Sequence, residues 1–374
     1  MTASTSGVRA DLVERLLDHC RHVCTTGQEG PIADAVAERY AGHDEPVTRI
    51  GNSVVVGVPT GDRPLVLLVG HLDVVPPTDD DRTPRVESRS DGEVVVARGA
   101  SDMKAGNVVA MALFEDAELR RRSPYELLLV LYAGEEGSAD TNELTAVLAG
   151  TPWLRTTALA VVLEPTDGEV QLGCLGGLHA LVTFHGQQAH SARPWHGRNA
   201  LTMAGSFLDE LERDHVRDVE VDGIRYRDVW SATQAWTDGL GPVPRTAAFA
   251  VRNVIPASFT VNLNLRFAPD RGLEQAEAEL RRRIGDRAEV EVVDRVPAAP
   301  PRLDEPIVRA FVEAVDAPVA GKQAWTDVAR FAEVGVPALN YGPGLTAQAH
   351  QRGEFVPVDA LVDAHERLAR FLGG

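Results

Sequence analysis

The sequence predicts an α/β fold that is interrupted by a smaller α+β domain, and two observations support this. Short apolar runs, typical of strands buried on both faces, alternate with helical periodicity in residues 1–175 and 295–374. Residues 176–294 contain strands in which apolar and polar side chains alternate, as in a sheet with one solvated face. Because 374 residues suffice for two domains, we expect a main domain with an inserted second one.

The main domain is expected to begin with two helices and to continue with buried strands. Apolar residues recur at helical spacing over 11–23 and 32–40. A polar, aspartate-rich loop over 78–85 follows the second strand. The other elements, in chain order, are strands over 53–58, 64–69 and 93–97, a helix over 105–121, and strands over 127–132 and 159–163.

The inserted domain is expected to be a small antiparallel sheet that helices cover on one face. Its strand over 259–267 alternates cleanly, with Phe259, Leu263 and Phe267 on the same side. Its other elements are a strand over 178–185, helices over 201–211 and 273–284, and a strand over 288–293. The main domain then resumes with helices over 303–315 and 325–334, a strand over 336–341 and a closing helix over 359–372.

Charge and cysteine content narrow the class of protein. A net charge of −18 and a pI of about 5.0 argue against partners such as nucleic acid or anionic membranes, which need basic patches. No stretch approaches the roughly 20 apolar residues of a membrane span, and no signal peptide is visible, so we expect a cytoplasmic protein. Cys20, Cys24 and Cys174 fit a reducing compartment, and a zinc knuckle at the first two would need a second ligand pair.

Acidic and histidine side chains recur where the predicted buried strands end. The carboxyl ends of parallel strands meet at one edge of an α/β sheet, where ligands bind. A single His-x-Asp pair is more often a structural hydrogen bond than a ligand site, so the recurrence carries the argument. The residues concerned are His71 and Asp73, Asp102 at the next strand-to-helix junction, the adjacent Glu135 and Glu136, and Glu164.

A second histidine, His350, follows a glycine-rich turn after the last predicted strand. Imidazole and carboxylate ligands without thiolate suit zinc or a similar divalent metal ion. Two histidines and three carboxylates can hold two ions if one carboxylate bridges them. Glu136 or Glu135 is then a ligand, and the spare glutamate can move a proton. Asp73 can fix the tautomer of a ligating histidine.

Five motifs resemble, in order and roughly in spacing, those of the co-catalytic zinc deacylase and exopeptidase family. They are His71-x-Asp73, Ser101-Asp102-Met103-Lys104, Glu135-Glu136, Glu164-Pro165-Thr166 and Ala349-His350. The family includes aminoacylases, glutamate-type carboxypeptidases, acetylornithine deacetylase and succinyl-diaminopimelate desuccinylase. The resemblance implies a mixed-sheet catalytic domain formed by 1–175 and 295–374, and a ferredoxin-like lid and dimerisation domain formed by 176–294.

The resemblance also implies a role for each of these residues and two divalent metal ions, expected to be Zn, with Co or Mn as substitutes. Asp102 would bridge the ions, and the peptide bond between Asp102 and Met103 would be cis. Glu135 would be the general base, and Asp73 would orient His71. His71 and Glu164 would bind one ion, and Glu136 and His350 the other.

The inserted domain carries a further match, around Ala189-His190-Ser191-Ala192-Arg193, which resembles the family's lid motif. The resemblance implies a homodimer formed through the lid. His190 would reach the active site of the partner subunit and stabilise the oxyanion of the tetrahedral intermediate. His196 is the alternative residue for this role.

A small-molecule N-acyl amino acid is the implied substrate. The segments Leu163-Glu164-Pro165-Thr166-Asp167-Gly168, Arg266-Phe267-Ala268-Pro269-Asp270-Arg271 and Trp325-Thr326-Asp327-Val328-Ala329-Arg330-Phe331 resemble those of the actinobacterial succinyl-diaminopimelate desuccinylases. This resemblance implies release of succinate and LL-diaminopimelate from N-succinyl-LL-2,6-diaminopimelate. Departures at Gly177, where Ser or Thr is usual, and at Arg252, which replaces a glycine, leave another N-acyl amino acid or a dipeptide open. The expected substrate contacts are Asn253, Arg266, Thr326, Arg330 and Gly344, together with Gly177 and Arg252.

Two other classes of protein fit less well. A dizinc aminopeptidase uses a similar ligand set, but monomeric aminopeptidases lack the matched lid domain. A metal-free binding or scaffold protein on this fold would have a broken ligand set, whereas every expected ligand is present here.

Overall fold

The computed structural model describes residues 5–43, 45–138, 140–237 and 253–374. The chain divides into two compact units, which we call the main unit and the inserted unit. The main unit comprises Met1–Gly173, Arg302–Ala320 and Arg330–Gly374, and the inserted unit comprises Cys174–Pro301 and Gly321–Ala329. The second segment belongs to the inserted unit through contacts such as the hydrogen bond from Leu175 N to Ala324 O, 3.2 Å long.

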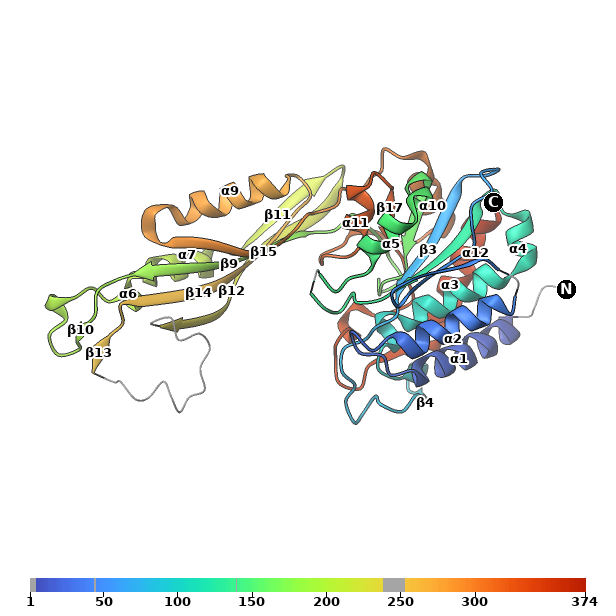
Figure 1. Cartoon of the computed structure of the whole chain (residues 1–374), viewed down its shortest axis with the longest axis horizontal. Coiled ribbons are helices and arrows are strands. Elements are labelled where there is room, and N and C mark those ends of the chain that lie inside the picture. The colour runs from blue at the N-terminus through green and yellow to red at the C-terminus, as the bar shows by residue number, and fades with distance from the viewer. Residues whose placement is uncertain (1–4, 44, 139, 238–252) are drawn as a thin grey trace. The chain divides into compact units, whose positions relative to one another are not determined.

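An eight-stranded sheet forms the centre of the main unit, with the order β1-β2-β6-β3-β7-β17-β8-β16 (Figure 1). The central strands β6, β3, β7 and β17 run parallel, whereas β1, β2 and β8 join antiparallel neighbours, so the predicted mixed sheet is confirmed. The strands are β1 (Val47–Ile50), β2 (Ser53–Val56), β3 (Leu65–His71), β6 (Glu126–Tyr132), β7 (Leu159–Val162), β8 (Val170–Leu172), β16 (Val319–Gly321) and β17 (Ala338–Asn340).

Strands β3, β6 and β7 are buried along their whole length, which is why each appears in the sequence as a continuous apolar run. Their register sets His71 beside Tyr132 and Val69 beside Val162, so the three strands end at the same edge of the sheet. A separate three-stranded sheet has the order β18-β5-β4. Its strands are β4 (Arg85–Arg89), β5 (Gly92–Val96) and β18 (Phe355–Pro357).

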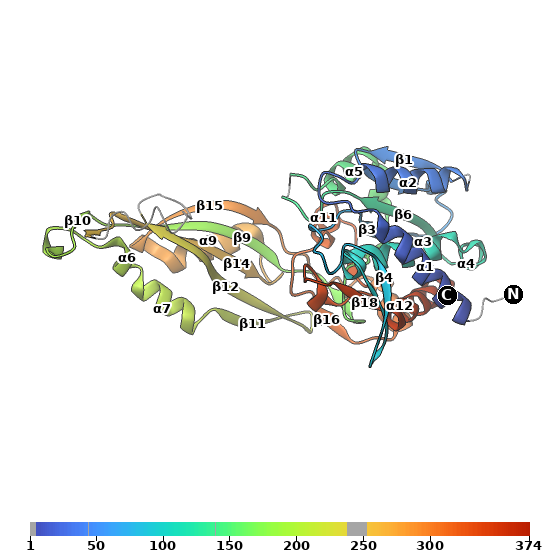
Figure 2. The ribbon, with the colours of Figure 1, turned by 90° about the horizontal axis from the view of Figure 1, so that it is seen from below.

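Helices α1, α3 and α12 pack against one another in the main unit (Figure 2). The single helix predicted over 105–121 is wrong: the Asp116 carboxylate accepts a hydrogen bond from Leu119 N and caps a new helix there. The helix predicted over 325–334 is shorter than expected. The main-unit helices are α1 (Thr5–Arg21), α2 (Gly30–Ala41), α3 (Ala105–Glu115), α4 (Ala117–Arg122), α5 (Leu144–Gly150), α10 (Pro306–Val315), α11 (Val328–Glu333) and α12 (Val358–Gly373).

The inserted unit is a five-stranded antiparallel sheet with the order β11-β12-β14-β9-β15. Without β11, the chain order and strand order are those of a ferredoxin-like βαββαβ fold, as predicted. Side chains of α7 and α9 share one core with the alternating residues of β9 and β14. The elements are β9 (Gly176–His185), α6 (Ala200–Met203), α7 (Gly205–Arg213), β11 (Val216–Val221), β12 (Ile224–Thr237), β14 (Ser258–Phe267), α9 (Leu273–Ile284) and β15 (Glu289–Val296).

The β11–β12 hairpin is absent from the predicted elements because its inward positions are not uniformly apolar. Asp228 lies between the buried Tyr226 and Trp230 and is itself buried. Its carboxylate pairs with the guanidinium groups of Arg217 and Arg271, which satisfies the buried charge. Across the described ranges, none of the helices has the length and apolar character that crossing a membrane demands.

Candidate active site

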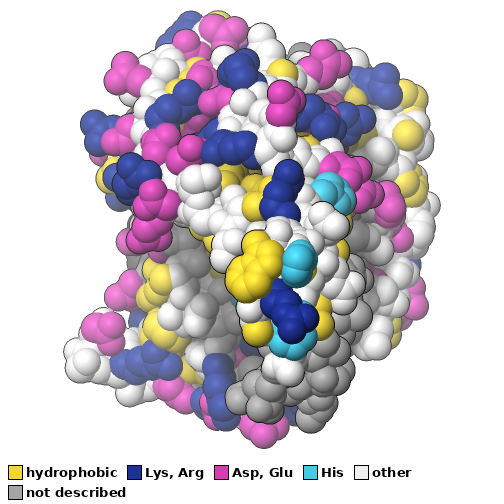
Figure 3. Space-filling view, turned by 90° about the vertical axis from the view of Figure 1, so that its left-hand side faces the viewer, with side chains coloured by type: hydrophobic (Ala, Val, Ile, Leu, Met, Phe, Trp, Pro, Cys, Tyr) yellow, Lys and Arg dark blue, Asp and Glu magenta, His cyan; other side chains and the backbone are white. Residues whose placement is uncertain are grey.

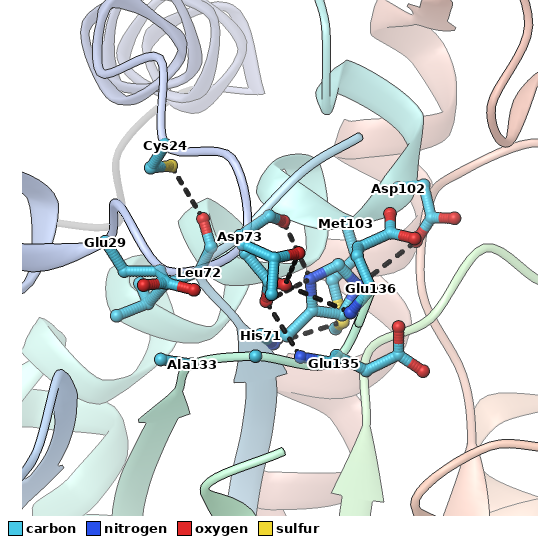
Figure 4. Close-up of polar contacts among 12 residues, drawn as sticks. Cys24, Glu29, His71, Leu72, Asp73, Asp102, Met103, Ala133, Glu135 and Glu136 are labelled. Atoms are coloured by element: carbon cyan, nitrogen blue, oxygen red, sulfur yellow. Dashed lines mark hydrogen bonds and ion pairs between the residues drawn. The ribbon is translucent and has the colours of Figure 1, made fainter. Parts of the chain in front are cut away.

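The chain segments that follow β3 and β6 are joined by the carboxylate of Asp73 (Figure 4). Asp73 Oδ1 accepts a hydrogen bond from Glu135 N, and Oδ2 accepts one from Glu136 N, each 3.0 Å long. Oδ2 also accepts a hydrogen bond of 2.9 Å from the hydroxyl of Thr26. A fully buried aspartate thus fixes the backbone of both glutamates beside the end of β3.

His71 is buried and has two different neighbours at its ring nitrogens. Its Nδ1 lies 2.9 Å from the main-chain oxygen of Asp73 but 3.7 Å from the carboxylate, so Nδ1–H donates to the carbonyl. Its Nε2 lies 3.3 Å from Asp102 Oδ1. Burial alone would lower the pKa of His71, yet the carboxylates of Asp102, Glu135 and Glu164 hold that pKa well above its usual range. This concentration of negative charge favours a cation.

Asp102 lies between the two predicted histidine ligands. Its other oxygen, Oδ2, is 3.7 Å from His350 Nε2, which is also 2.8 Å from Glu136 Oε2. Hydrogen bonding to Glu136 raises the pKa of His350. The peptide bond between Asp102 and Met103 is cis, as the family resemblance implied.

The predicted ligands form three overlapping groups, in each of which the ligand atoms lie within 4.8 Å of one another. Two imidazoles and several carboxylates, without thiolate, are a donor set that suits a divalent metal ion such as Zn. The residues present therefore fit metal ions. The groups are His71, Asp102 and Glu164; His71, Glu135 and Glu136; and Asp102, Glu136 and His350.

Glu354 is a contributor to the site that the sequence did not reveal. Its buried carboxylate accepts hydrogen bonds from the backbone N–H groups of Gly99, Ser101 and Asp102. Burial raises the pKa of Glu354 to about 7, against the opposite effect of these N–H groups. The only sequence signal would have been an acidic residue that closely follows His350, and its partners lie more than 250 positions away in the sequence.

Two of the predicted substrate contacts lie in the main unit. Gly344 packs so closely on the backbone of Ser101 that a Cβ atom there would lie 2.2 Å from Ser101 O. Its main-chain oxygen accepts a hydrogen bond from Thr166 N, 3.1 Å long. Arg330 Nη1 donates to the hydroxyl of Thr145 at 2.6 Å, so at least one arm of its guanidinium has a protein partner.

The other predicted substrate contacts belong to the inserted unit. Arg266 and Gly177 are direct neighbours across β14 and β9. Burial lowers the pKa of Arg266, and its guanidinium has no hydrogen bond or ion pair with another described residue. Asn253 is exposed, and Thr326 is buried. Arg252 lies outside the described residues.

The predicted lid residues lie in an exposed part of the inserted unit. His190 is exposed in β10 (Ala189–His190), and its Nδ1 accepts a hydrogen bond from Ala192 N at 3.0 Å. His196 is exposed in the next turn, beside Trp195, whose relative exposure is 73%. Figure 3 looks onto this end of the unit, where histidine side chains adjoin hydrophobic and basic ones.

Comparison with known proteins shows the family to which the chain belongs. The family model of peptidase family M20/M25/M40 matches residues 67–373. A Mycobacterium tuberculosis protein named as a candidate succinyl-diaminopimelate desuccinylase, DapE, is 37% identical over 93% of this chain and 94% of its own length. The succinyl-diaminopimelate desuccinylase of Corynebacterium glutamicum is 32% identical over 96% of this chain and 95% of its own length.

Solved structures share the fold at much lower identity. A tripeptidase from Staphylococcus aureus superposes with a TM-score of 0.74 at 16% identity and 98% coverage of both chains. The YXEP protein of Bacillus subtilis, described as a dinuclear metal binding peptidase of the M20 family, has a TM-score of 0.67 at 15% identity and 98% coverage of both chains. The chain therefore belongs to peptidase family M20/M25/M40.

Proposed function

We propose that this protein is a metal-dependent amidohydrolase that removes the N-acyl group from an acylated amino acid, with N-succinyl-LL-2,6-diaminopimelate as the first candidate substrate. The observation that carries the proposal is the set of three overlapping His and carboxylate groups at one edge of the main sheet. The desuccinylase names of the M. tuberculosis and C. glutamicum relatives support the candidate substrate.

The proposed centre holds two divalent ions, with Zn expected and Co or Mn as substitutes. Asp102 belongs to two of the three groups, which suits a bridging carboxylate. Two ions, when bound, supply an activated water and polarise the scissile carbonyl. In this assignment His71 and Glu164 hold one ion, and Glu136 and His350 hold the other.

Glu135 is the proposed general base. Its carboxylate takes a proton from the attacking water, whose oxygen bonds to the acyl carbon, and passes that proton to the nitrogen as the C–N bond breaks. The products are a carboxylic acid and an amine. The Asp73 carboxylate accepts a hydrogen bond from the backbone N–H of Glu135. The backbone from which the side chain of the base extends is therefore fixed beside the proposed ligands.

An acidic acyl group fits the inserted unit. Arg266 is partly buried, and burial lowers its pKa against the attraction of the Asp294 carboxylate. Its guanidinium makes no hydrogen bond with a described residue, so a carboxylate of the substrate would supply one. Succinate has such a carboxylate. Asn253, Thr326 and Gly344 stay proposed contacts, as does Arg330.

Gly177 favours a second candidate, a deacylase for a different N-acyl amino acid. A Cβ atom at Gly177 would lie 3.0 Å from Arg266 Nη1 and 3.1 Å from Val296 Cγ2. The Ser or Thr expected in desuccinylases would therefore press on the guanidinium, which must lie differently where such a side chain is present. Gly177 therefore leaves the Arg266 guanidinium in a position that a Ser or Thr side chain would disturb, which would alter the acyl group it accepts.

The inserted unit is also the proposed dimerisation domain. The exposed His190, with His196 as the alternative, is proposed to complete the partner subunit's site as an oxyanion donor. The cytoplasm stays the proposed location, in keeping with the free thiols of Cys20, Cys24 and Cys174, which suit a reducing compartment.

A substrate panel tests the proposal. The Zn- or Co-loaded protein is assayed with N-succinyl, N-acetyl and N-carbamoyl amino acids and with dipeptides, and we expect N-succinyl-diaminopimelate to give the highest kcat/KM. Hydrolysis of another acyl amino acid in its place would remove the desuccinylase assignment and leave the deacylase. Hydrolysis of dipeptides alone would overturn both.

Metal removal should abolish turnover of whichever substrate the panel identifies. Dialysis against a chelator strips the ions, and the carboxylates around His71 then lose the cation that offsets their repulsion. We expect activity to return on addition of Zn or Co, with metal analysis giving two ions per chain. Full activity in a chain that mass spectrometry finds free of metal would contradict this expectation.

A further inference from the structure

We propose that Glu354, held in place by Arg98 and Asp81, is a positioning residue that sets the Asp102 segment against the His350 segment. We call these three residues the clamp. The proposal rests on the metal centre of the proposed function, and it concerns residues to which the family resemblance gave no role. All the residues concerned lie within the main unit.

The Glu354 carboxylate is saturated with donors from the Asp102 segment. Oε1 accepts from Ser101 N at 2.7 Å and from Asp102 N at 2.9 Å, and Oε2 accepts from Gly99 N at 2.8 Å. Oε2 also accepts from Arg98 Nη1 at 2.9 Å. Glu354 is only 1% exposed, so water does not replace these partners.

Donor chemistry explains why this position carries a carboxylate. Every partner of Glu354 is a donor, and an ionised carboxylate offers acceptor sites on both oxygens. A glutamine has nearly the same shape but would turn an NH₂ group toward one pair of these N–H donors. The buried donors would then lack an acceptor, which costs about 1–3 kcal/mol for each such group.

Arg98 and Asp81 complete the clamp from the other side. Arg98 Nη2 lies 3.1 Å from Asp81 Oδ2, which also accepts a hydrogen bond of 2.9 Å from Gly353 N. Arg98 and Asp81 are 5% and 1% exposed. The chain immediately before Glu354 is therefore fixed by the same carboxylate that orients the guanidinium.

A second connection joins the same two segments closer to His350. The hydroxyl of Ser101 accepts a hydrogen bond from Leu345 N at 2.6 Å and donates one to Leu345 O at 3.1 Å. The segment from Leu345 to Glu354 is thus tied at both ends to residues next to Asp102. His350 lies within it, at a φ of 61° that non-glycine residues seldom adopt. The clamp, together with the Ser101–Leu345 hydrogen bonds, therefore sets the separation of Asp102 from His350.

The experiment compares Glu354→Gln with Glu126→Gln by metal titration and by the visible absorption spectrum of the Co(II)-loaded protein. Glu126 is a matched control, because it too is a buried carboxylate that accepts backbone N–H bonds, from Thr60 and Gly61, but at the start of β6. We expect Glu354→Gln to weaken metal affinity about 10–100-fold and to change the Co(II) spectrum. Glu126→Gln should change neither.

Wild-type affinity and an unaltered Co(II) spectrum in Glu354→Gln would overturn the proposal. If that variant does not fold, Asp81→Asn takes its place, since the Asp81 carboxylate binds Arg98 and the backbone N–H groups of Thr78 and Gly353. The same shifts are expected, and unchanged values would again overturn the proposal. A wild-type protein that binds no divalent metal would instead overturn the proposed function. Metal affinity and spectrum do not depend on which acyl group is the substrate, so the two failures are distinguishable.

Discussion

Glu135→Gln is expected to lower kcat about 10²–10⁴-fold and to leave the metal content unchanged. Glutamine keeps the size of the side chain but cannot accept the proton of the attacking water. The backbone of residue 135 stays hydrogen-bonded to Asp73, so the neighbouring Glu136 should keep its place. Steady-state kinetics on the best substrate of the panel, together with metal analysis of the same sample, measure both quantities.

Glu135→Asp is the matched comparison, since it retains a carboxylate and only shortens its reach. We expect an intermediate rate, with a pH profile of the same form as that of the wild type. Unchanged kcat in Glu135→Gln would remove the general-base assignment. Loss of metal together with activity would instead make Glu135 a ligand, an option its grouping with His71 and Glu136 allows.

Gly344→Ala is expected to displace the backbone that carries the proposed metal ligands. The added methyl group would lie 2.2 Å from Ser101 O and 2.7 Å from Pro165 Cβ, and neither atom belongs to a flexible side chain. Ser101 precedes Asp102, and Pro165 follows Glu164, so any relief moves a predicted ligand. We expect a loss of about 1–3 kcal/mol in the free energy of unfolding and a marked fall in kcat/KM.

Gly30→Ala is the control for that substitution. It lies at the start of α2, and its Cβ atom would meet only Asn52 Oδ1, at 3.8 Å, which is an ordinary contact. Thermal unfolding and metal titration of both variants separate a steric effect from the general effect of replacing glycine. Equal behaviour of Gly344→Ala and Gly30→Ala would show that the close packing on Ser101 is tolerated.

The sequence was most informative about the strands that are buried at every position. Strands β3, β6 and β7 are wholly buried, so only apolar residues fit and the runs are unmistakable. The residues that follow them could therefore be placed at one edge of the sheet. The β11–β12 hairpin escaped prediction because a buried charge, Asp228, is balanced by arginines that local pattern cannot identify.

The hydrogen bonds that support the site were harder to predict from the sequence. The spacing of His71 and Asp73 in the sequence predicts that they are neighbours. It does not predict which oxygen of Asp73 faces Nδ1 of His71. The main-chain carbonyl takes that position, and the carboxylate serves the N–H groups of Glu135 and Glu136. Glu354 is joined to Gly99 across 255 positions, and no local periodicity reports such a partner.

The separation of the proposed ligands along the chain has a consequence for biosynthesis. His71 is made early, whereas His350 and Glu354 emerge only after Cys174–Pro301 has left the ribosome. Metal binding stabilises a fold only once its ligands are brought together. A nascent chain that stops before His350 therefore lacks both the last proposed ligand and Glu354 of the clamp. Loading of the proposed metal pair thus belongs to the final moments of synthesis or to the time after release.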